Sequence, residues 1–175
     1  MPTNASVDRA LAAIAKDDSK KLGVIVNGKA ITTGQYIPKA EAQTAPQISL
    51  STATPSQTYL LISLDLDAPF QSFRALGPIL HWIQPGFVLD TTTSTLVSKE
   101  PFIANYIGPA PPPGSGPHRY SFYLFQQPEG FDGKKFAPAD GKEMGNWGRM
   151  RFDLDAWIAK AGLGDPIAAN YFTSN

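Results

Sequence analysis

The sequence has 175 residues, 42% of them hydrophobic and 17% charged, which suits one domain with its own hydrophobic core. Its 15 Lys and Arg residues balance 15 Asp and Glu residues, so no net charge directs it to nucleic acid or an anionic membrane. The absence of cysteine excludes disulfides, zinc–thiolate sites, iron–sulfur clusters and thiol nucleophiles.

Residues 1–20 are expected to form a helical segment at the periphery of a single domain spanning residues 1–175. Val7, Leu11 and Ile14 recur at helical spacing, and Ser6 is the candidate N-cap. The segment lacks the long apolar stretch of a signal peptide, and the longest apolar run, residues 59–64, is too short to span a bilayer. The sequence therefore predicts a cytoplasmic protein without an integral membrane segment.

Short extended segments separated by turn residues follow, which is typical of a mostly β domain. Two of them, residues 58–65 and 119–126, carry apolar side chains on both alternating faces. Strands of this kind lie inside a sheet that is covered on both sides. The full set of candidate strands is 22–26, 47–51, 58–65, 79–84 and 119–126, with a weaker one at 95–98.

The clearest helix lies near the end of the sequence. Asp153 is its candidate N-cap, and Gly162 suits a left-handed C-cap in which Leu163 closes on Ile158. The apolar tail 167–172 is expected to pack back on the body of the domain. The apolar stripe of the helix consists of Leu154, Trp157, Ile158 and Ala161.

Two carboxylates follow the first central strand, in the run Asp65-Leu66-Asp67-Ala68-Pro69. In extended chain, residues two apart face the same way, so Asp65 and Asp67 would point to one side and furnish a site. The alternative is that this run only ends the strand, because a helix cap fully explains the similar run that begins at Asp153.

The two histidines are the next candidates. His81 stands among apolar residues, where a hydrogen-bonded core histidine is the alternative to a functional one. His118 follows the loop 107–117, whose many Pro and Gly residues make it stiff and able to approach a ligand closely. Alternation places Tyr120 on the same face as His118 and Arg119 on the other, which favours Arg119 as an ion-pair partner of a carboxylate.

These motifs occur in an order that resembles the phosphatidylethanolamine-binding protein family, also called Raf kinase inhibitor proteins. The ordered set is Asp65 to Pro69, Leu80-His81-Trp82, Tyr106-Ile107-Gly108-Pro109 and Gly114 to Tyr120, ending in Leu124-Phe125-Gln126-Gln127. The resemblance implies a mostly β fold, in which a large central antiparallel sheet packs on a smaller sheet, with N-terminal and C-terminal helices.

The resemblance also implies an anion-accepting pocket at one edge of the sheet. Where the family usually has proline between the two aspartates, this sequence has Leu66, which is expected to make the turn less rigid. The ligand-binding residues carried over by motif are Asp65, Asp67, His81, Gly108, Ala110, Pro111, His118 and Tyr120, with Tyr171 in a lid.

The resemblance implies a protein that binds a phosphate-bearing small ligand or a phospholipid head group and regulates a partner enzyme. Its members include kinase-cascade inhibitors, plant flowering regulators and an inhibitor of a vacuolar serine carboxypeptidase, so a serine carboxypeptidase or a signalling kinase is the expected partner. A carboxylate beside a histidine raises the pKa of the imidazole. Binding of phosphate groups should therefore strengthen as the pH falls below about 7.

Two other classes of function stay open. An Asp–His pair with a tyrosine would suit a small-molecule enzyme that works by acid–base catalysis. Against this, residues 114–116 lack the spacing of a nucleophile elbow, and no dinucleotide or phosphate-loop fingerprint is present. Two Asp and two His residues would also suit zinc or manganese, but the resemblance implies no required metal, and no cofactor is expected.

Overall fold

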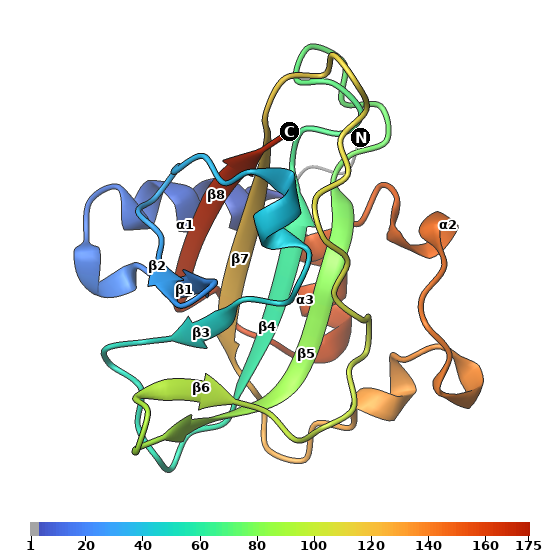
Figure 1. Cartoon of the computed structure of the whole chain (residues 1–175). Helices are drawn as coiled ribbons and strands as arrows, with labels where there is room; N and C mark the ends of the chain where they lie inside the picture. The colour runs from blue at the N-terminus through green and yellow to red at the C-terminus, as the bar shows by residue number, and fades with distance from the viewer. Residues whose placement is uncertain (1–3) are drawn as a thin grey trace.

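A strongly curved antiparallel sheet, with helices packed on one of its faces, forms the part of the chain that the structure describes (Figure 1). The structure is a computed structural model and describes residues 4–175, apart from the side chain of residue 140. Residues 1–3 of the predicted N-terminal segment lie outside the described residues. The strands are β1 (Gly23–Val26), β2 (Lys29–Ala30), β3 (Gln47–Ser49), β4 (Tyr59–Asp65), β5 (Ile79–Asp90), β6 (Thr95–Val97), β7 (His118–Gln126) and β8 (Ala168–Ser174). The α-helices are α1 (Ala5–Ile14), α2 (Asn146–Arg149) and α3 (Leu154–Ala161).

The eight strands follow the order β2-β1-β3-β6-β5-β4-β7-β8. The long strand β5 joins two halves, because it pairs with β4 from Ile79 to Phe87 and with β6 from Val88 to Asp90. The larger half contains β5, β4, β7 and β8, and the smaller half contains β2, β1, β3, β6 and the end of β5. The predicted mostly β fold, with a large sheet packed on a smaller one, is confirmed.

Strand β5 is longer than the predicted segment 79–84. A bulge lies at Pro85 and Gly86, where the register between β4 and β5 shifts and Gly86 has a φ of +76°. The Gly86 amide donates to Gln127 Oε1 at 2.8 Å rather than to the neighbouring strand. The Pro-Gly pair therefore bends the strand without ending it, so that β5 continues into the smaller half.

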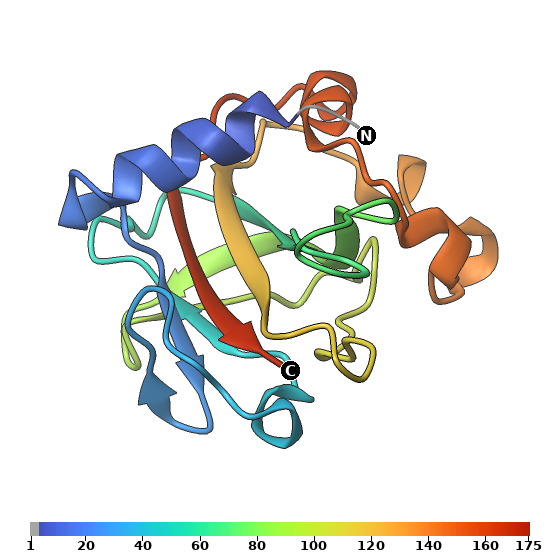
Figure 2. The same ribbon diagram turned by 90° about the horizontal axis from the view of Figure 1, so that it is seen from above.

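Two hydrophobic core layers cover the larger half, one on each face. Strand β4 contributes Leu61 to the layer between the two halves of the sheet, and Leu60 and Ile62 to the layer beneath the helices. Figure 2 shows α1 and α3 side by side over one face, with β1 and β3 on the opposite side. The prediction that β4 and β7 are covered on both faces is confirmed.

The helix α3 has the predicted caps. Asp153 accepts a hydrogen bond from the Ala156 amide at 2.9 Å, and Gly162 is left-handed with a φ of +68°. The Leu163 amide donates to the Ile158 carbonyl at 3.0 Å. The apolar tail forms β8, which pairs with β7.

The helices α1 and α3 cap one another across the sequence. The Asp155 carboxylate accepts hydrogen bonds from the Ala5 amide at 2.7 Å, the Ser6 amide at 3.1 Å and the Ser6 hydroxyl. In return, Asn4 Oδ1 accepts from the Leu154 amide at 2.7 Å. The prediction of Ser6 as N-cap was wrong: α1 begins at Ala5 with Asn4 in the N-cap position, and Ser6 is buried against α3.

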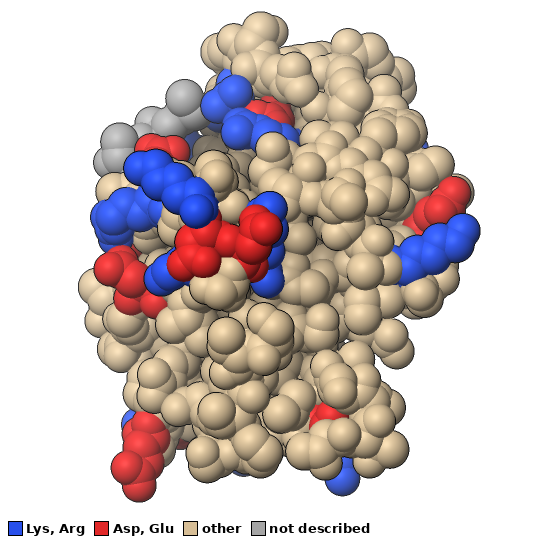
Figure 3. Space-filling model, turned by 90° about the vertical axis from the view of Figure 1, so that its left-hand side faces the viewer, with Lys and Arg blue, Asp and Glu red and all other residues tan. Residues whose placement is uncertain are grey.

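Charged side chains on the surface that Figure 3 shows form small clusters of both signs among larger uncharged areas. Neither sign dominates that face. Among residues 4–175, no helix has the length and apolar character needed to cross a membrane.

Candidate anion-binding site

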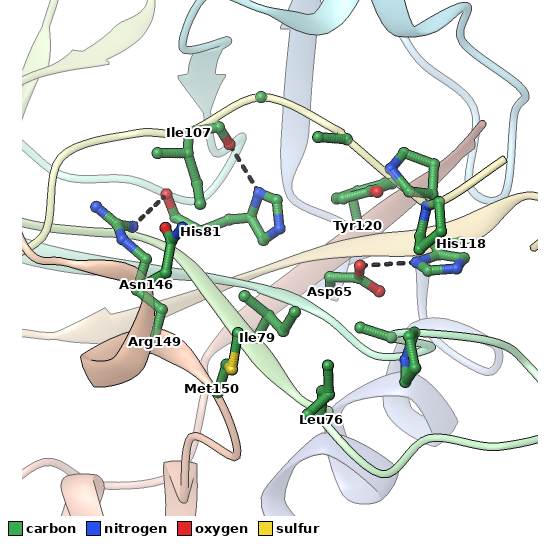
Figure 4. Close-up of a pocket in the computed structure, with 16 residues that line it drawn as sticks. Asp65, Leu76, Ile79, His81, Ile107, His118, Tyr120, Asn146, Arg149 and Met150 are labelled. Carbon is green, nitrogen blue, oxygen red and sulfur yellow. Dashed lines mark hydrogen bonds and ion pairs between the residues drawn. The ribbon is translucent and has the colours of Figure 1, made fainter.

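A cavity of about 240 Å³ opens at the end of the sheet where β4 ends and β5 and β7 begin (Figure 4). Its remaining walls come from residues 68–76, the loop 107–112 and α2. The predicted residues that line it are Asp65, His81, Gly108, Ala110, Pro111, His118 and Tyr120, whereas Asp67 and Tyr171 do not. Residues that were not predicted also line it, among them Leu76, Ile79, Asn146, Arg149 and Met150.

His118 and Asp65 form a buried pair that lines one side of the cavity. His118 Nδ1 lies 2.8 Å from Asp65 Oδ2, and both side chains are almost fully buried. Burial alone would lower the pKa of His118, but the hydrogen bond and charge of Asp65, with the charge of Asp67, outweigh burial and raise it. His118 Nε2 is also buried and has no hydrogen-bond partner among the described residues. The protonated ring therefore has one N–H, at Nε2, without an acceptor in hydrogen-bonding geometry among the described residues; the backbone of Pro69 makes the smallest contribution to the raised pKa.

Tyr120 lies between the two histidines (Figure 4). Its ring meets His81 edge-on, with 5.0 Å between centroids, and stacks on His118 at 6.4 Å. Burial raises the pKa of Tyr120, and the negative charge of Asp65 adds to this effect. The hydroxyl group thus stays protonated, and in the described part of the chain it makes no hydrogen bond.

His81 is fixed by the loop that forms the upper wall. Its Nδ1 lies 2.7 Å from the Ile107 carbonyl, and the Ile107 amide donates to the His81 carbonyl at 2.9 Å. Because a carbonyl only accepts, the proton of neutral His81 is on Nδ1 and Nε2 is left as an acceptor. Burial lowers the pKa of His81 and outweighs the opposing effects of the Ile107 hydrogen bond and the charge of Asp65, while the charges of Arg149 and His118 add a smaller lowering.

Asp67 belongs to a separate ion-pair cluster. It accepts from the Arg119 amide at 2.9 Å and from Arg119 Nε and Nη2 at 2.8 Å each, and Arg74 Nε lies 3.2 Å away. The expectation that Asp65 and Asp67 face one site was wrong, because β4 ends at Asp65 and the chain bends there, so the alternation of a strand no longer applies. The prediction that Arg119 pairs with a carboxylate is confirmed.

Leu66 occupies the place where the resemblance leads us to expect proline. Its amide donates to the Arg119 carbonyl at 3.0 Å, and its side chain is buried in the core beneath the helices. Proline has no N–H and could not make this bond. The bond continues the β4–β7 ladder one residue beyond Asp65, directly beside the cavity.

The remaining predicted residues lie in the loop or on β8. Gly108 lines the cavity, and the loop passes so close to residue 43 there that a Cβ on Gly108 would lie 2.8 Å from the Cα of Gln43. Tyr171 lies on β8 with its hydroxyl group near Gly34, outside the cavity wall.

Among the lining residues that were not predicted, Arg149 is the one with a charged side chain. It is 1% exposed, and its guanidinium group donates to carbonyl oxygens of Met144, Leu80 and Asn105 at 2.9–3.2 Å. The surrounding sequence 145–151 has no periodicity or motif that marks a buried arginine. Its position depends on contacts with residues 40 to 70 positions earlier in the chain.

The four predicted Asp and His residues do not assemble into a set of metal ligands. Asp67 is held by Arg119 and Arg74, and His81 Nδ1 is held by the Ile107 carbonyl. Among the side chains that the structure describes, no three His, Cys, Asp or Glu residues are grouped as ligands of one ion.

Comparison with known proteins places this geometry in context. Residues 27–172 match the family model described as phosphatidylethanolamine-binding protein. A protein named phomoidride biosynthesis cluster protein N, from Talaromyces stipitatus, is 34% identical over 164 residues, which cover 83% of this chain and 79% of the relative. The carboxypeptidase Y inhibitor of Saccharomyces cerevisiae is 28% identical over 147 residues, covering 77% and 67%.

A solved structure agrees with the match. The crystal structure of carboxypeptidase Y inhibitor complexed with the cognate proteinase aligns with a TM-score of 0.74 and 26% identity. The alignment covers 98% of this chain and 95% of the inhibitor. The similarity therefore includes the whole sheet and the elements around the cavity.

Proposed function

This chain belongs to the phosphatidylethanolamine-binding protein family, and on that basis we propose that its cavity binds a phosphate-like anion and that occupancy modulates a partner enzyme. The observation that carries the proposal is a pair of buried groups without partners, His118 Nε2 and Tyr120 Oη, that meet in one cavity. Buried polar groups are normally hydrogen-bonded, so a ligand with acceptor oxygens would supply the hydrogen bonds that these two donors lack. The negative charge of Asp65 does not oppose an anion when His118 is protonated.

The two histidines give this binding a defined pH dependence. His81 has a lowered pKa, so it is mainly neutral at neutral pH and accepts a proton when an anion arrives. Anion binding and protonation of His81 are then linked, and each favours the other. We expect phosphate affinity to increase as the pH falls below about 7 toward the pKa of His81.

Binding is tested by following both imidazoles by NMR while inorganic phosphate or glycerophosphoethanolamine is added. The expected result is a higher pKa of His81 with ligand, and the two ligands distinguish a free phosphate from a lipid head group. Tyr120→Phe removes the free hydroxyl group and should weaken binding about 3- to 30-fold. Tyr123→Phe is the matched control, because Tyr123 Oη is also buried without a partner but lies in the core beneath the helices.

If neither ligand changes the pKa of either histidine, the binding proposal fails. An equal loss of affinity in Tyr120→Phe and Tyr123→Phe would show that the effect is on the fold rather than on the cavity.

For the partner, we propose a serine carboxypeptidase. The support is the similarity over 98% of the chain to an inhibitor whose crystal structure contains its cognate proteinase. The test measures inhibition of purified carboxypeptidase Y with and without inorganic phosphate. Inhibition that changes with phosphate in the wild type, and less so in Tyr120→Phe, supports regulation through the cavity. If carboxypeptidase Y is not inhibited, the same assay is repeated with a signalling kinase, the other predicted partner. We expect this protein to be cytoplasmic, where such kinases act.

A second candidate function is acid–base chemistry on a small anionic molecule. The observation that favours it is the 34% identical relative named for a biosynthesis cluster, together with the buried Asp65–His118 pair and Tyr120. A positioned acid or base contributes typically about 10²- to 10⁴-fold to a rate. If His118→Gln keeps its fold but loses turnover by that factor, the protein is an enzyme. In a regulator, the same substitution would change only the affinity for the partner.

A further inference from the structure

The surroundings of Arg149 differ from those of the other buried charges. A guanidinium group has five N–H donors, and here each has an oxygen partner. Nε donates to the Met144 carbonyl at 2.9 Å, Nη1 to the Leu80 and His81 carbonyls at 3.2 and 3.5 Å, and Nη2 to Asn105 O and Oδ1 at 3.1 and 2.5 Å. All these partners are uncharged, and no carboxylate in the described part of the chain forms an ion pair with Arg149.

Each of the other buried charges near the cavity has a partner of opposite sign. Asp65 pairs with His118, and Asp67 pairs with Arg119 and Arg74. The acidic side chain that acts on Arg149 is Glu143, which is exposed and therefore screened by water. Burial lowers the pKa of Arg149, but arginine remains charged throughout the physiological range. Arg149 is thus a buried cation at the cavity wall, and no carboxylate of the described residues forms an ion pair with it.

Arg149 and His118 lie on opposite sides of the cavity, with His81 and Tyr120 between them (Figure 4). The groups that face His81 are Asp65, Arg149, His118 and Tyr120. Among the four, Arg149 is the cation whose charge does not change between about pH 5 and pH 9.

We infer that Arg149 is the specificity-determining residue of the cavity, whose fixed charge allows a phosphate-like anion to bind even when His81 is neutral. This inference rests on the proposed function. Since its N–H groups are all occupied, Arg149 acts through its charge and by holding the backbone of Leu80, His81 and Asn105 in place. A buried cation without a counter-ion is costly, and a bound anion would supply that counter-ion.

The inference predicts a specific change in the pH profile of binding. In the wild type, affinity should fall only about tenfold from about pH 6 to about pH 8.5, because Arg149 stays charged while His81 loses its proton. In Arg149→Met, binding should depend on protonated His81, and affinity at about pH 8.5 should be roughly 30- to 100-fold below the wild type. At about pH 6, where more of His81 is protonated, the affinity of Arg149→Met should be closer to that of the wild type.

Dimethyl phosphate is a suitable probe, because it remains a monoanion throughout this pH range. Its affinity is measured by titration calorimetry or NMR for the wild type and three variants. Arg149→Lys keeps the charge but has three N–H donors instead of five, so it should bind better than Arg149→Met and within about fivefold of the wild type if the charge is what matters. Arg151→Met is the matched control: it removes one positive charge from an exposed neighbour that does not line the cavity, and it should leave affinity within about twofold.

The outcomes separate the inference from the proposed function. If the wild type binds neither dimethyl phosphate nor inorganic phosphate at either pH, the proposed function fails. If it binds, but folded Arg149→Met matches Arg151→Met at about pH 8.5, the inference fails. Should Arg149→Met not fold, the wild-type profile decides: binding that disappears together with the proton of His81 overturns the inference, and binding that persists at about pH 8.5 supports it.

Discussion

At the scale of single residues, Asp67 and Arg119 form an ion pair with three hydrogen bonds beside the cavity. The carboxylate is 1% exposed and accepts three hydrogen bonds from one arginine. Burial alone would raise the pKa of Asp67, but the hydrogen bonds and charge of Arg119, with the charge of Arg74, outweigh it and lower the pKa. Because β4 ends immediately before this pair, the pair fixes the turn that leaves Asp65 facing the cavity.

We predict that Asp67→Asn lowers the free energy of unfolding by about 3 kcal/mol at neutral pH, since it leaves a partly buried arginine without its partner. A carboxylate with a lowered pKa stabilises the fold above its unfolded pKa of 3.8 and loses this effect as the pH falls through the folded value. The difference between wild type and variant should therefore shrink below about pH 4. Urea unfolding at both pH values measures it.

Arg74→Met is the control for that measurement. Arg74 is 44% exposed and makes one longer contact of 3.2 Å with Asp67, so its loss should cost less than about 1 kcal/mol. Equal effects of Asp67→Asn and Arg74→Met would contradict the assigned role of Arg119.

The residues that could be predicted were those with a local signal. Alternation along β7 placed His118 and Tyr120 on one face and Arg119 on the other, and the structure has this arrangement. Asp67 was placed wrongly because a bend in the chain is not visible in an i, i+2 pattern. Arg149 could not be found because most of its oxygen partners, on Leu80, His81 and Asn105, lie far earlier in the chain.

At the scale of elements, α1 is held by a residue of α3. The Asp155 carboxylate accepts three hydrogen bonds at the N-terminus of α1, and the buried face of α1 consists of Ser6, Val7, Ala10 and Ile14. Burial alone would raise the pKa of Asp155, but the bonds from Ser6 and Ala5 outweigh it and lower the pKa. A helix with so short an apolar face depends on such a cap.

We predict that Asp155→Ala destabilises the protein by about 1–2 kcal/mol and selectively lowers the protection of α1 amides against hydrogen exchange. Asp153→Ala is the matched control, because Asp153 caps its own helix α3 through the Ala156 amide. That variant should cost about 1 kcal/mol while α1 keeps its protection relative to β4. Uniform loss of protection in Asp155→Ala would show that α1 does not open on its own.

The elements differ in how far the sequence could define them. The helix α3 carries both caps within its own sequence, and both were predicted correctly. The start of α1 was misplaced because its cap comes from a residue about 150 positions away. The extension of β5 was missed for a related reason: Pro85 and Gly86 usually end a strand, and only the partner strands reveal a bulge there.

At the scale of the whole molecule, the larger half of the sheet separates two hydrophobic cores. Trp82 belongs to the core between the two halves of the sheet, and Trp157 packs against the core beneath the helices. Trp147 is 89% exposed and belongs to neither. The chain therefore contains a fluorescent probe in each core.

If residues 1–175 are a single domain, as the sequence predicts, both cores should unfold together. We expect Trp147→Phe/Trp157→Phe, which keeps Trp82, and Trp147→Phe/Trp82→Phe, which keeps Trp157, each to unfold in one transition. In each variant, the fluorescence midpoint should coincide with the midpoint from circular dichroism. A fluorescence midpoint below the circular dichroism midpoint in either variant would reveal two separately folding parts.

The position of β8 has a consequence for how the protein is made. Phe172 stacks on Tyr120 with 5.6 Å between ring centroids, and Ser174 pairs with His118. These supports of the cavity follow all its lining residues in the sequence. During synthesis, a chain that has already exposed His81, His118 and Arg149 outside the ribosome still lacks the strand that pairs with β7 and packs behind Tyr120. The nascent protein therefore acquires the support for its cavity only after residues 168–174 have emerged from the exit tunnel.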